Sequence, residues 1–195
     1  MGYSIESSTA NCYEGTTCLI NKFDIHDESK LATLESDITL AKSIILEHTP
    51  IELPMDFSFY KNIHKVLFED IYDWAGELRT VDISKKGTYF CSVNQLEELC
   101  ENCFKRLINN NYFKNLNKND FVYEIVDFYI TLNMLHPFRE GNGRTQRIFI
   151  TKLIKYNGYD FDFANMDNDE LMSATIKSAN GISDFLIRLF ENEIR

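Results

Sequence analysis

The chain of 195 residues lacks several features that would place it in common classes of protein. It has no apolar run long enough to cross a membrane, and its N-terminus lacks a basic and then apolar signal pattern. Basic residues are outnumbered, 20 against 30 acidic ones, and the net charge of −10 argues against non-specific binding of nucleic acid. We therefore expect a cytoplasmic protein that binds neither a membrane nor nucleic acid.

Cysteines are few and odd in number, which argues against a disulfide framework and for reduced thiols. The five are Cys12, Cys18, Cys91, Cys100 and Cys103. Cys100 and Cys103 share a helical face, but no second Cys or His pair offers itself to complete a zinc site. A zinc protein is therefore not expected.

Apolar residues recur at helical spacing along most of the chain. We expect helices from Asp27 or Ser29 to about 48, from about 59 to 75, over 95–107, from Asn117 or Asn119 to 135, and over 144–156, 167–179 and 183–193. Between the second and third helices, residues 79–91 have β-branched and aromatic residues around Lys86 and Gly87, which predicts a short β-hairpin. The expected fold class is all-α, a helical bundle with one short β-hairpin. Residues 1–20 form a polar arm and 21–195 a single domain.

The densest group of reactive residues is His-Pro-Phe-Arg-Glu-Gly-Asn-Gly-Arg-Thr-Gln-Arg at 136–147. Gly141 and Gly143 stand at the start of an expected helix, where bare backbone N–H groups and the helix dipole favour an anion. Arg144 and Arg147 are three residues apart, so they share a face and can bind two phosphate groups. The segment therefore predicts a phosphate site.

Two further residues of this segment supply reactive groups. Glu140 is a carboxylate of the kind that holds Mg2+ beside phosphates. His136 has a side chain suited to general base work near neutral pH. Each piece alone is more often structural, as a turn, a helix cap or a solvated helix face. Together they predict attack on a nucleotide phosphate.

This segment resembles the signature of the Fic family, His-Pro-Phe-x-(Asp/Glu)-Gly-Asn-Gly-Arg-x-x-Arg, at every specified position. The similarity extends from about Asn21 to Phe190 and includes residues 68–79 and 82–91. It implies a toxin-type Fic bundle in which the hairpin is a flap. It also implies a nucleotidyltransferase that transfers AMP from ATP to a Ser, Thr or Tyr hydroxyl of a target protein, a reaction called AMPylation.

The resemblance assigns a role to each residue of the motif. His136 is the base, Gly141 and Gly143 cradle the phosphates, Glu140 holds Mg2+, Asn142 contacts the α-phosphate, Arg144 the β-phosphate and Arg147 the γ-phosphate. The flap residues that would align the target hydroxyl are Ile83, Ser84, Lys85, Lys86 and Gly87.

Glu35 is a candidate inhibitory residue. Fic proteins that restrain themselves carry Ser/Thr-x-x-x-Glu-Gly/Asn on a helix, and its glutamate pairs with the second motif arginine. Here Leu31 replaces the Ser/Thr and Ser36 the Gly/Asn. Glu35 is thus expected either to reach Arg147 as a leaky restraint or to face solvent. In the second case a small antitoxin-like protein would be the inhibitor. A second copy of the chain is a further candidate partner.

Two alternatives to AMP transfer stay open. Related Fic proteins transfer UMP, phosphocholine or a phosphate, although both arginines of the full motif favour AMP. The chain could also be a nucleotide-binding interaction module without catalysis, but the presence of His136 and Glu140 argues against this.

Overall fold

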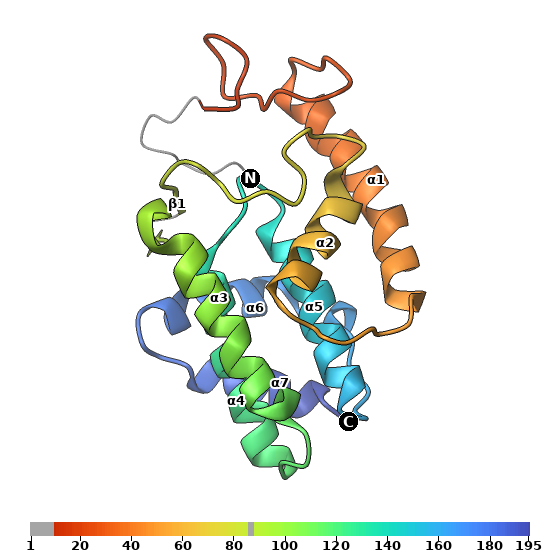
Figure 1. Ribbon diagram of the computed structural model, residues 1–195, viewed down its shortest axis with the longest axis vertical. Helices are drawn as coiled ribbons and strands as arrows, with labels where there is room; N and C mark the ends of the chain where they lie inside the picture. The colour runs from red at the N-terminus through yellow and green to blue at the C-terminus, as the bar shows by residue number, and fades with distance from the viewer. Residues whose placement is uncertain (1–9, 86–87) are drawn as a thin grey trace.

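The structure, a computed structural model, describes residues 10–85 and 88–195 and consists of helices with one small sheet (Figure 1). The helices are α1 (Glu28–His48), α2 (Phe57–Phe68), α3 (Val93–Asn109), α4 (Lys118–Leu135), α5 (Asn142–Tyr156), α6 (Asn168–Ala179) and α7 (Asp184–Glu193). Short 3-10 turns lie at Asn111–Phe113 and Phe163–Asn165. The predicted all-α fold with one hairpin is confirmed.

Side-chain caps explain where several helices begin. The carboxylate or amide oxygens of Asp27, Asp56, Asn117 and Asp167 accept hydrogen bonds from backbone N–H groups in the first turn of α1, α2, α4 and α6. α1 ends where Thr49 precedes a proline, which disfavours helical backbone. Of the two starts proposed for each helix, Asp27 and Asn117 are the ones observed.

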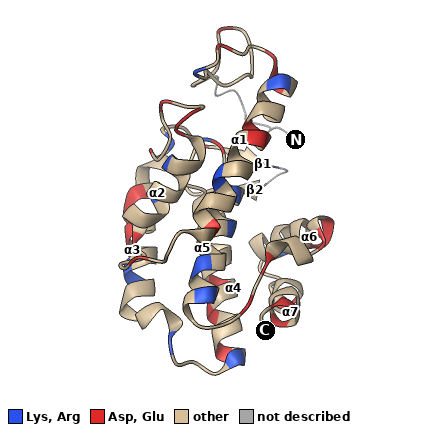
Figure 2. Ribbon diagram, turned by 90° about the vertical axis from the view of Figure 1, so that its right-hand side faces the viewer, with Lys and Arg blue, Asp and Glu red and all other residues tan. Residues whose placement is uncertain are grey.

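α4 and α5 form the middle of the molecule, with α2 and α3 on one side and α6 and α7 on the other (Figure 2). A cluster of buried aromatic rings fills the space between α2, α3, α4 and α5. Phe149 lies at its centre, with ring centroids of Tyr60, Phe104 and Phe128 at 5.5, 5.3 and 5.9 Å. Tyr60 also stacks on Phe138, which is fully buried, at 5.6 Å. The cluster therefore anchors the loop between α4 and α5 from below, through edge-on and offset ring contacts.

The second helix is shorter than predicted, because it ends at Phe68 and not near Ala75. The chain then turns back, with backbone N–H groups of Ile71 and Tyr72 both donating to the carbonyl of Phe68. This turn buries Ile71 and Tyr72 completely, which a continued helix would not do. The turn also brings Gly76 beside His64, whose Nδ1 accepts the Gly76 N–H at 2.8 Å.

The hairpin consists of β1 (Ser84–Lys85) and β2 (Thr88–Tyr89), with Ser84 opposite Tyr89 and Lys85 opposite Thr88. Of the five predicted flap residues, Lys86 and Gly87 lie outside the described residues. The base of the hairpin is fixed by Arg79, only 4% exposed, whose guanidinium donates to carbonyls of Val81, Cys91, Leu135 and His136. One side chain thus joins both ends of the hairpin to the end of α4.

The expectations about membrane spans, cysteines and charge concern the whole domain. No helix in the described residues is long and apolar enough to span a bilayer. All five cysteines are free thiols, as expected. Figure 2 shows the acidic residues spread over many helices and not gathered in one patch.

His64 should make folding stability depend on pH. It is fully buried, its Nδ1 accepts from Gly76, and its Nε2–H donates to the Glu140 carbonyl at 3.0 Å. Burial lowers the pKa of His64 from about 6.5 to about 3. As the pH falls below about 6.5, His64 becomes protonated in the unfolded chain but stays neutral in the folded protein. Between pH 7.5 and 5.5 this costs about 1.4 kcal/mol of stability.

The measurement is urea unfolding of wild type and His64→Gln at both pH values. The variant should lose about 1.4 kcal/mol less than wild type over this interval, because its side chain does not titrate. His48→Gln, at an exposed histidine of α1, is the control and should keep the wild-type dependence. An equal pH dependence in all three proteins would contradict a neutral buried His64.

Candidate active site

His136 caps the C-terminal end of α4 in the left-handed conformation, with φ 46° and ψ 59°. Such a conformation costs a non-glycine residue on the order of 1 kcal/mol or more and must be held by its surroundings. Here the His136 N–H donates to the Leu132 carbonyl at 3.1 Å, and its own carbonyl accepts from Arg79 Nε at 2.8 Å. The backbone of the predicted base is therefore fixed on both sides.

The His136 ring is also oriented. Its Nδ1 lies 3.1 Å from the carbonyl oxygen of Asn133, which can only accept, so Nδ1 carries the proton and Nε2 is the unprotonated nitrogen. Phe90, which follows β2, stacks on the ring with centroids 3.8 Å apart and an angle of 13°. No pattern in the sequence indicates this stacking partner.

Burial lowers the pKa of His136 to about 3, outweighing the hydrogen bond to Asn133, and nearby Lys85 and Arg79 lower it further. The imidazole is therefore neutral near pH 7. A neutral imidazole with a defined basic nitrogen is the form that can accept a proton.

The loop from 138 to 142 is closed by the side chain of Asn142, which is 2% exposed. Its Oδ1 accepts the Phe138 N–H at 2.8 Å, and its Nδ2 donates to the Phe138 carbonyl at 2.7 Å. The amide is thus committed to the loop. A contact of this residue with an α-phosphate would have to come from its backbone N–H, in the first turn of α5, where N–H groups have no intrahelical acceptor.

The two glycines of the motif serve different purposes. Gly141 has φ +78°, and a Cβ on it would stand 2.2 Å from the ring of Phe68, so the backbone itself requires glycine. Gly143 has no such constraint, since a Cβ there would meet nothing within 4 Å. The need for glycine at 143 is not explained by the protein's own packing.

A cavity of about 200 Å³ adjoins this loop. His136, Gly143 and Arg147 line it on the motif side, and Lys85, Thr88 and Phe90 on the hairpin side. α6 forms a further wall, with the apolar side chains Leu171, Met172 and Ile176, and α4 contributes Tyr129 and Asn133. The cavity thus has a polar end that contains the predicted base and an apolar side. The contribution of α6 was not predicted.

Glu140 is the only carboxylate of the motif. Its Oε1 accepts the Gly141 N–H at 2.9 Å and lies 3.5 Å from an Nη of Arg144, and the side chain is 24% exposed. Burial raises the pKa of the Glu140 carboxyl, as does Glu35, while the Gly141 N–H opposes this. The described residues hold no group of three or more His, Cys, Asp or Glu that could bind a metal. A single carboxylate fits Mg2+ held mainly by water and phosphate oxygens.

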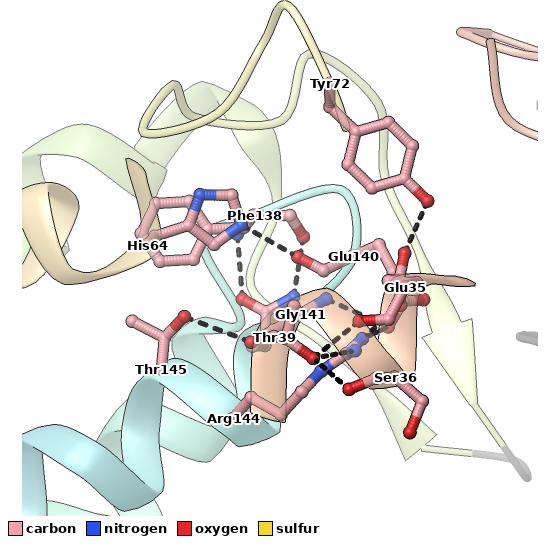
Figure 3. Close-up of polar contacts among 11 residues, drawn as sticks. Glu35, Ser36, Thr39, His64, Tyr72, Phe138, Glu140, Gly141, Arg144 and Thr145 are labelled. Carbon is pink, nitrogen blue, oxygen red and sulfur yellow. Dashed lines mark hydrogen bonds and ion pairs between the residues drawn. The ribbon is translucent and has the colours of Figure 1, made fainter. Parts of the chain in front are cut away.

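The two motif arginines point to different places. Arg147 is exposed and lines the cavity, and within the described ranges it makes no ion pair. Arg144 instead reaches α1, where it forms an ion pair with Glu35 and donates to Thr39 Oγ1 at 3.2 Å (Figure 3).

Both expected placements of Glu35 are therefore wrong, and its inhibitory role stays a prediction. It contacts Arg144 and not Arg147, because α1 packs against the first turn of α5 rather than over the cavity. It does not face solvent either, since it is 8% exposed and accepts a hydrogen bond from the Tyr72 hydroxyl.

The motif was recognisable from the sequence, but the residues that hold it were not. His64, which interrupts an apolar helical stretch, was the available signal in the sequence, and it does not indicate a partner. The supporting residues that the structure adds are Thr39, His64, Tyr72, Arg79 and Phe90.

Comparisons with known proteins agree with this site. A family model described as Fic/DOC family matches residues 54–154, which include the whole motif. The chain is 35% identical over 179 residues to the protein adenylyltransferase VbhT of Bartonella schoenbuchensis, covering 92% of this chain but 37% of that protein. It is 33% identical over 171 residues to the probable protein adenylyltransferase y4lH of Sinorhizobium fredii, covering 87% and 88%.

Among solved structures, the BepC protein of Bartonella tribocorum, crystallised with bound AMPPNP, superposes with a TM-score of 0.90 at 28% identity. The match covers 96% of this chain and 97% of that one. Sequence, fold and the geometry of residues 136–147 thus lead to one conclusion: the chain belongs to the Fic/DOC family.

Proposed function

We propose that this chain is a protein adenylyltransferase, which transfers AMP from ATP to a hydroxyl group of a target protein. The observation that carries the proposal is the neutral His136, with Nε2 as its basic nitrogen, in a cavity shared with the N-terminus of α5 and Arg147. The names of the relatives and the AMPPNP bound by BepC support it. Because the chain spans 37% of VbhT, the proposal concerns this domain.

In the proposed reaction, the target oxygen attacks the α-phosphorus of ATP while His136 Nε2 takes the hydroxyl proton. The new oxygen–phosphorus bond replaces the bond to pyrophosphate, which leaves with its charge. Backbone N–H groups of Asn142 and Gly143 would face the α-phosphate, and Arg147 an outer phosphate. These donors stand in place before the reaction, so charge developing in the transition state is stabilised without reorganisation.

Mg2+, when bound, would neutralise negative charge on the phosphates. Glu140 is the residue that would hold it, since its carboxylate lies next to the Gly141 N–H at the start of α5. Arg144 lies beside Glu140 and would serve the β-phosphate. The apolar side chains of α6 would cover the nucleoside.

The target would approach along the hairpin. Tyr89 on β2 is 72% exposed, and this strand pair leaves an edge that can receive an extended segment. Ser84 and Lys85 on β1 and Ile83 before it would then align the target hydroxyl. Five free cysteines and the use of ATP support a cytoplasmic setting for this reaction.

The direct test uses His136→Ala and ATP labelled at the α-phosphate. General base catalysis contributes about 10²–10⁴-fold, so transfer of label to a target, or to the protein itself, should fall by at least that factor. His48→Ala is the matched control at an exposed histidine and should label like wild type. Labelling by a folded His136→Ala protein at the wild-type rate would overturn the proposed role.

A second prediction concerns the two glycines. Gly143→Ala should fold normally, because its Cβ meets no protein atom, but should weaken ATP binding at least about tenfold by standing where the phosphates approach. Gly141→Ala should instead lower stability by about 1–3 kcal/mol, through the Phe68 ring and the positive φ. Thermal melting and calorimetry with ATP would measure both. Wild-type affinity for ATP in Gly143→Ala would exclude phosphate binding at this glycine.

A further inference from the structure

Four groups converge on the guanidinium of Arg144. Glu35 forms an ion pair with one Nη, and Thr39 Oγ1 lies 3.2 Å from the other. Glu140 Oε1 is 3.5 Å away, and the ring of Phe68 lies beneath the guanidinium carbon at 4.8 Å. Figure 3 shows that Glu35 and Thr39 come from α1 and Glu140 from the motif loop, and Phe68 is the last residue of α2.

The α1 side of this cluster has its hydrogen-bond directions fixed. The Thr39 hydroxyl donates its proton to the Glu35 carbonyl at 2.7 Å, so its oxygen is left to accept from Arg144. Glu35 accepts from Tyr72 with one carboxylate oxygen and from Arg144 with the other. Burial, with the carboxylate of Glu35, raises the pKa of Tyr72, so the phenol remains a donor.

Glu35 and Glu140 compete for the same guanidinium. Glu35 holds the short ion pair, whereas the Glu140 oxygen stands at 3.5 Å, beyond the length of a strong charge-assisted hydrogen bond. Without Glu35, the nearest anion to Arg144 would be Glu140, four positions earlier in the chain and just before α5. A closed Arg144–Glu140 pair would occupy both the carboxylate that would hold Mg2+ and the cation that would face a phosphate.

We infer that Glu35 is a positioning residue for catalysis. Together with Thr39 and Tyr72, it orients the Arg144 side chain and prevents a close ion pair between Arg144 and Glu140. The inference rests on the proposed function. Arg144 has five N–H donors, and α1 takes up only part of them. The arginine is thus fixed before the nucleotide arrives, so binding does not have to restrict a long flexible side chain.

This role is opposite in sign to inhibition. An inhibitory Glu35 would obstruct a phosphate, and its removal would raise activity. A positioning Glu35 lies outside the cavity walls, and its removal should weaken binding of the outer phosphates. The direction of the change therefore separates the two roles.

The test compares Mg2+–ATP with AMP, which lacks the β- and γ-phosphates, by calorimetry. Glu35→Gln should raise the Kd for ATP about tenfold and the KM for ATP in label transfer similarly, while leaving the Kd for AMP unchanged. Tyr72→Phe, which removes only the bond to Glu35, should act in the same direction by a smaller factor. Asp37→Asn, an exposed acid on the same helix, is the charge control and should bind ATP like wild type.

A double-mutant cycle shows whether Glu35 acts through Arg144. In an Arg144→Met background, Glu35→Gln should cause no further loss of ATP affinity. Three results would overturn the inference: unchanged ATP affinity in Glu35→Gln, equal weakening of ATP and AMP, or faster label transfer. If wild type itself neither binds ATP nor transfers label, the proposed function fails first. If wild type does both and the variants match it, only this inference fails.

Discussion

The buried amide of Asn142 is the interaction on which the site depends. It bonds to both the N–H and the carbonyl of Phe138, and so fixes the distance between the end of α4 and the start of α5. Arg79, which precedes the hairpin, also holds the end of α4, because its guanidinium donates to the carbonyls of Leu135 and His136. All of these groups are buried, and a buried donor or acceptor that loses its partner costs about 1–3 kcal/mol. The loop therefore has one favourable geometry, with His136 in a left-handed conformation.

The two arginines of the motif illustrate how neighbouring positions acquire different surroundings. Arg147 lies one turn further along α5 and reaches the cavity, while Arg144 lies against α1. Because α1 and α2 pack on α5, the anionic partner of Arg144 on that side is, within the described structure, Glu35. One guanidinium is thus held by the protein, and the other lies open to a ligand.

The sequence predicted the helices well where the signal is local. Asp27 and Asn117 begin helices as their side chains suggested, and the motif of 136–147 could be identified residue by residue. Prediction failed where the decision is made by distant contacts. α2 ends at Phe68 because Ile71 and Tyr72 are buried by a turn, although the intervening residues are compatible with helix.

The same limit applies to side-chain partners. Glu35 lies 109 positions from Arg144 in the chain, and helical spacing can place it on a face without saying what lies opposite. Arg79 and His64 were likewise invisible as supports of the motif. Their bonds join segments 57 and 76 positions apart.

The composite walls of the cavity have a consequence for motion. The hairpin, the motif loop and α6 meet around it, yet within the described structure α6 packs on the rest of the domain chiefly through α4 and α7. A ligand that touches all three walls would add a link between α6 and the hairpin. Transient opening of α6 would then become rarer, and its amide protons would exchange with solvent more slowly. Hydrogen exchange in α6, a helix that carries none of the motif, would therefore report whether the site is occupied.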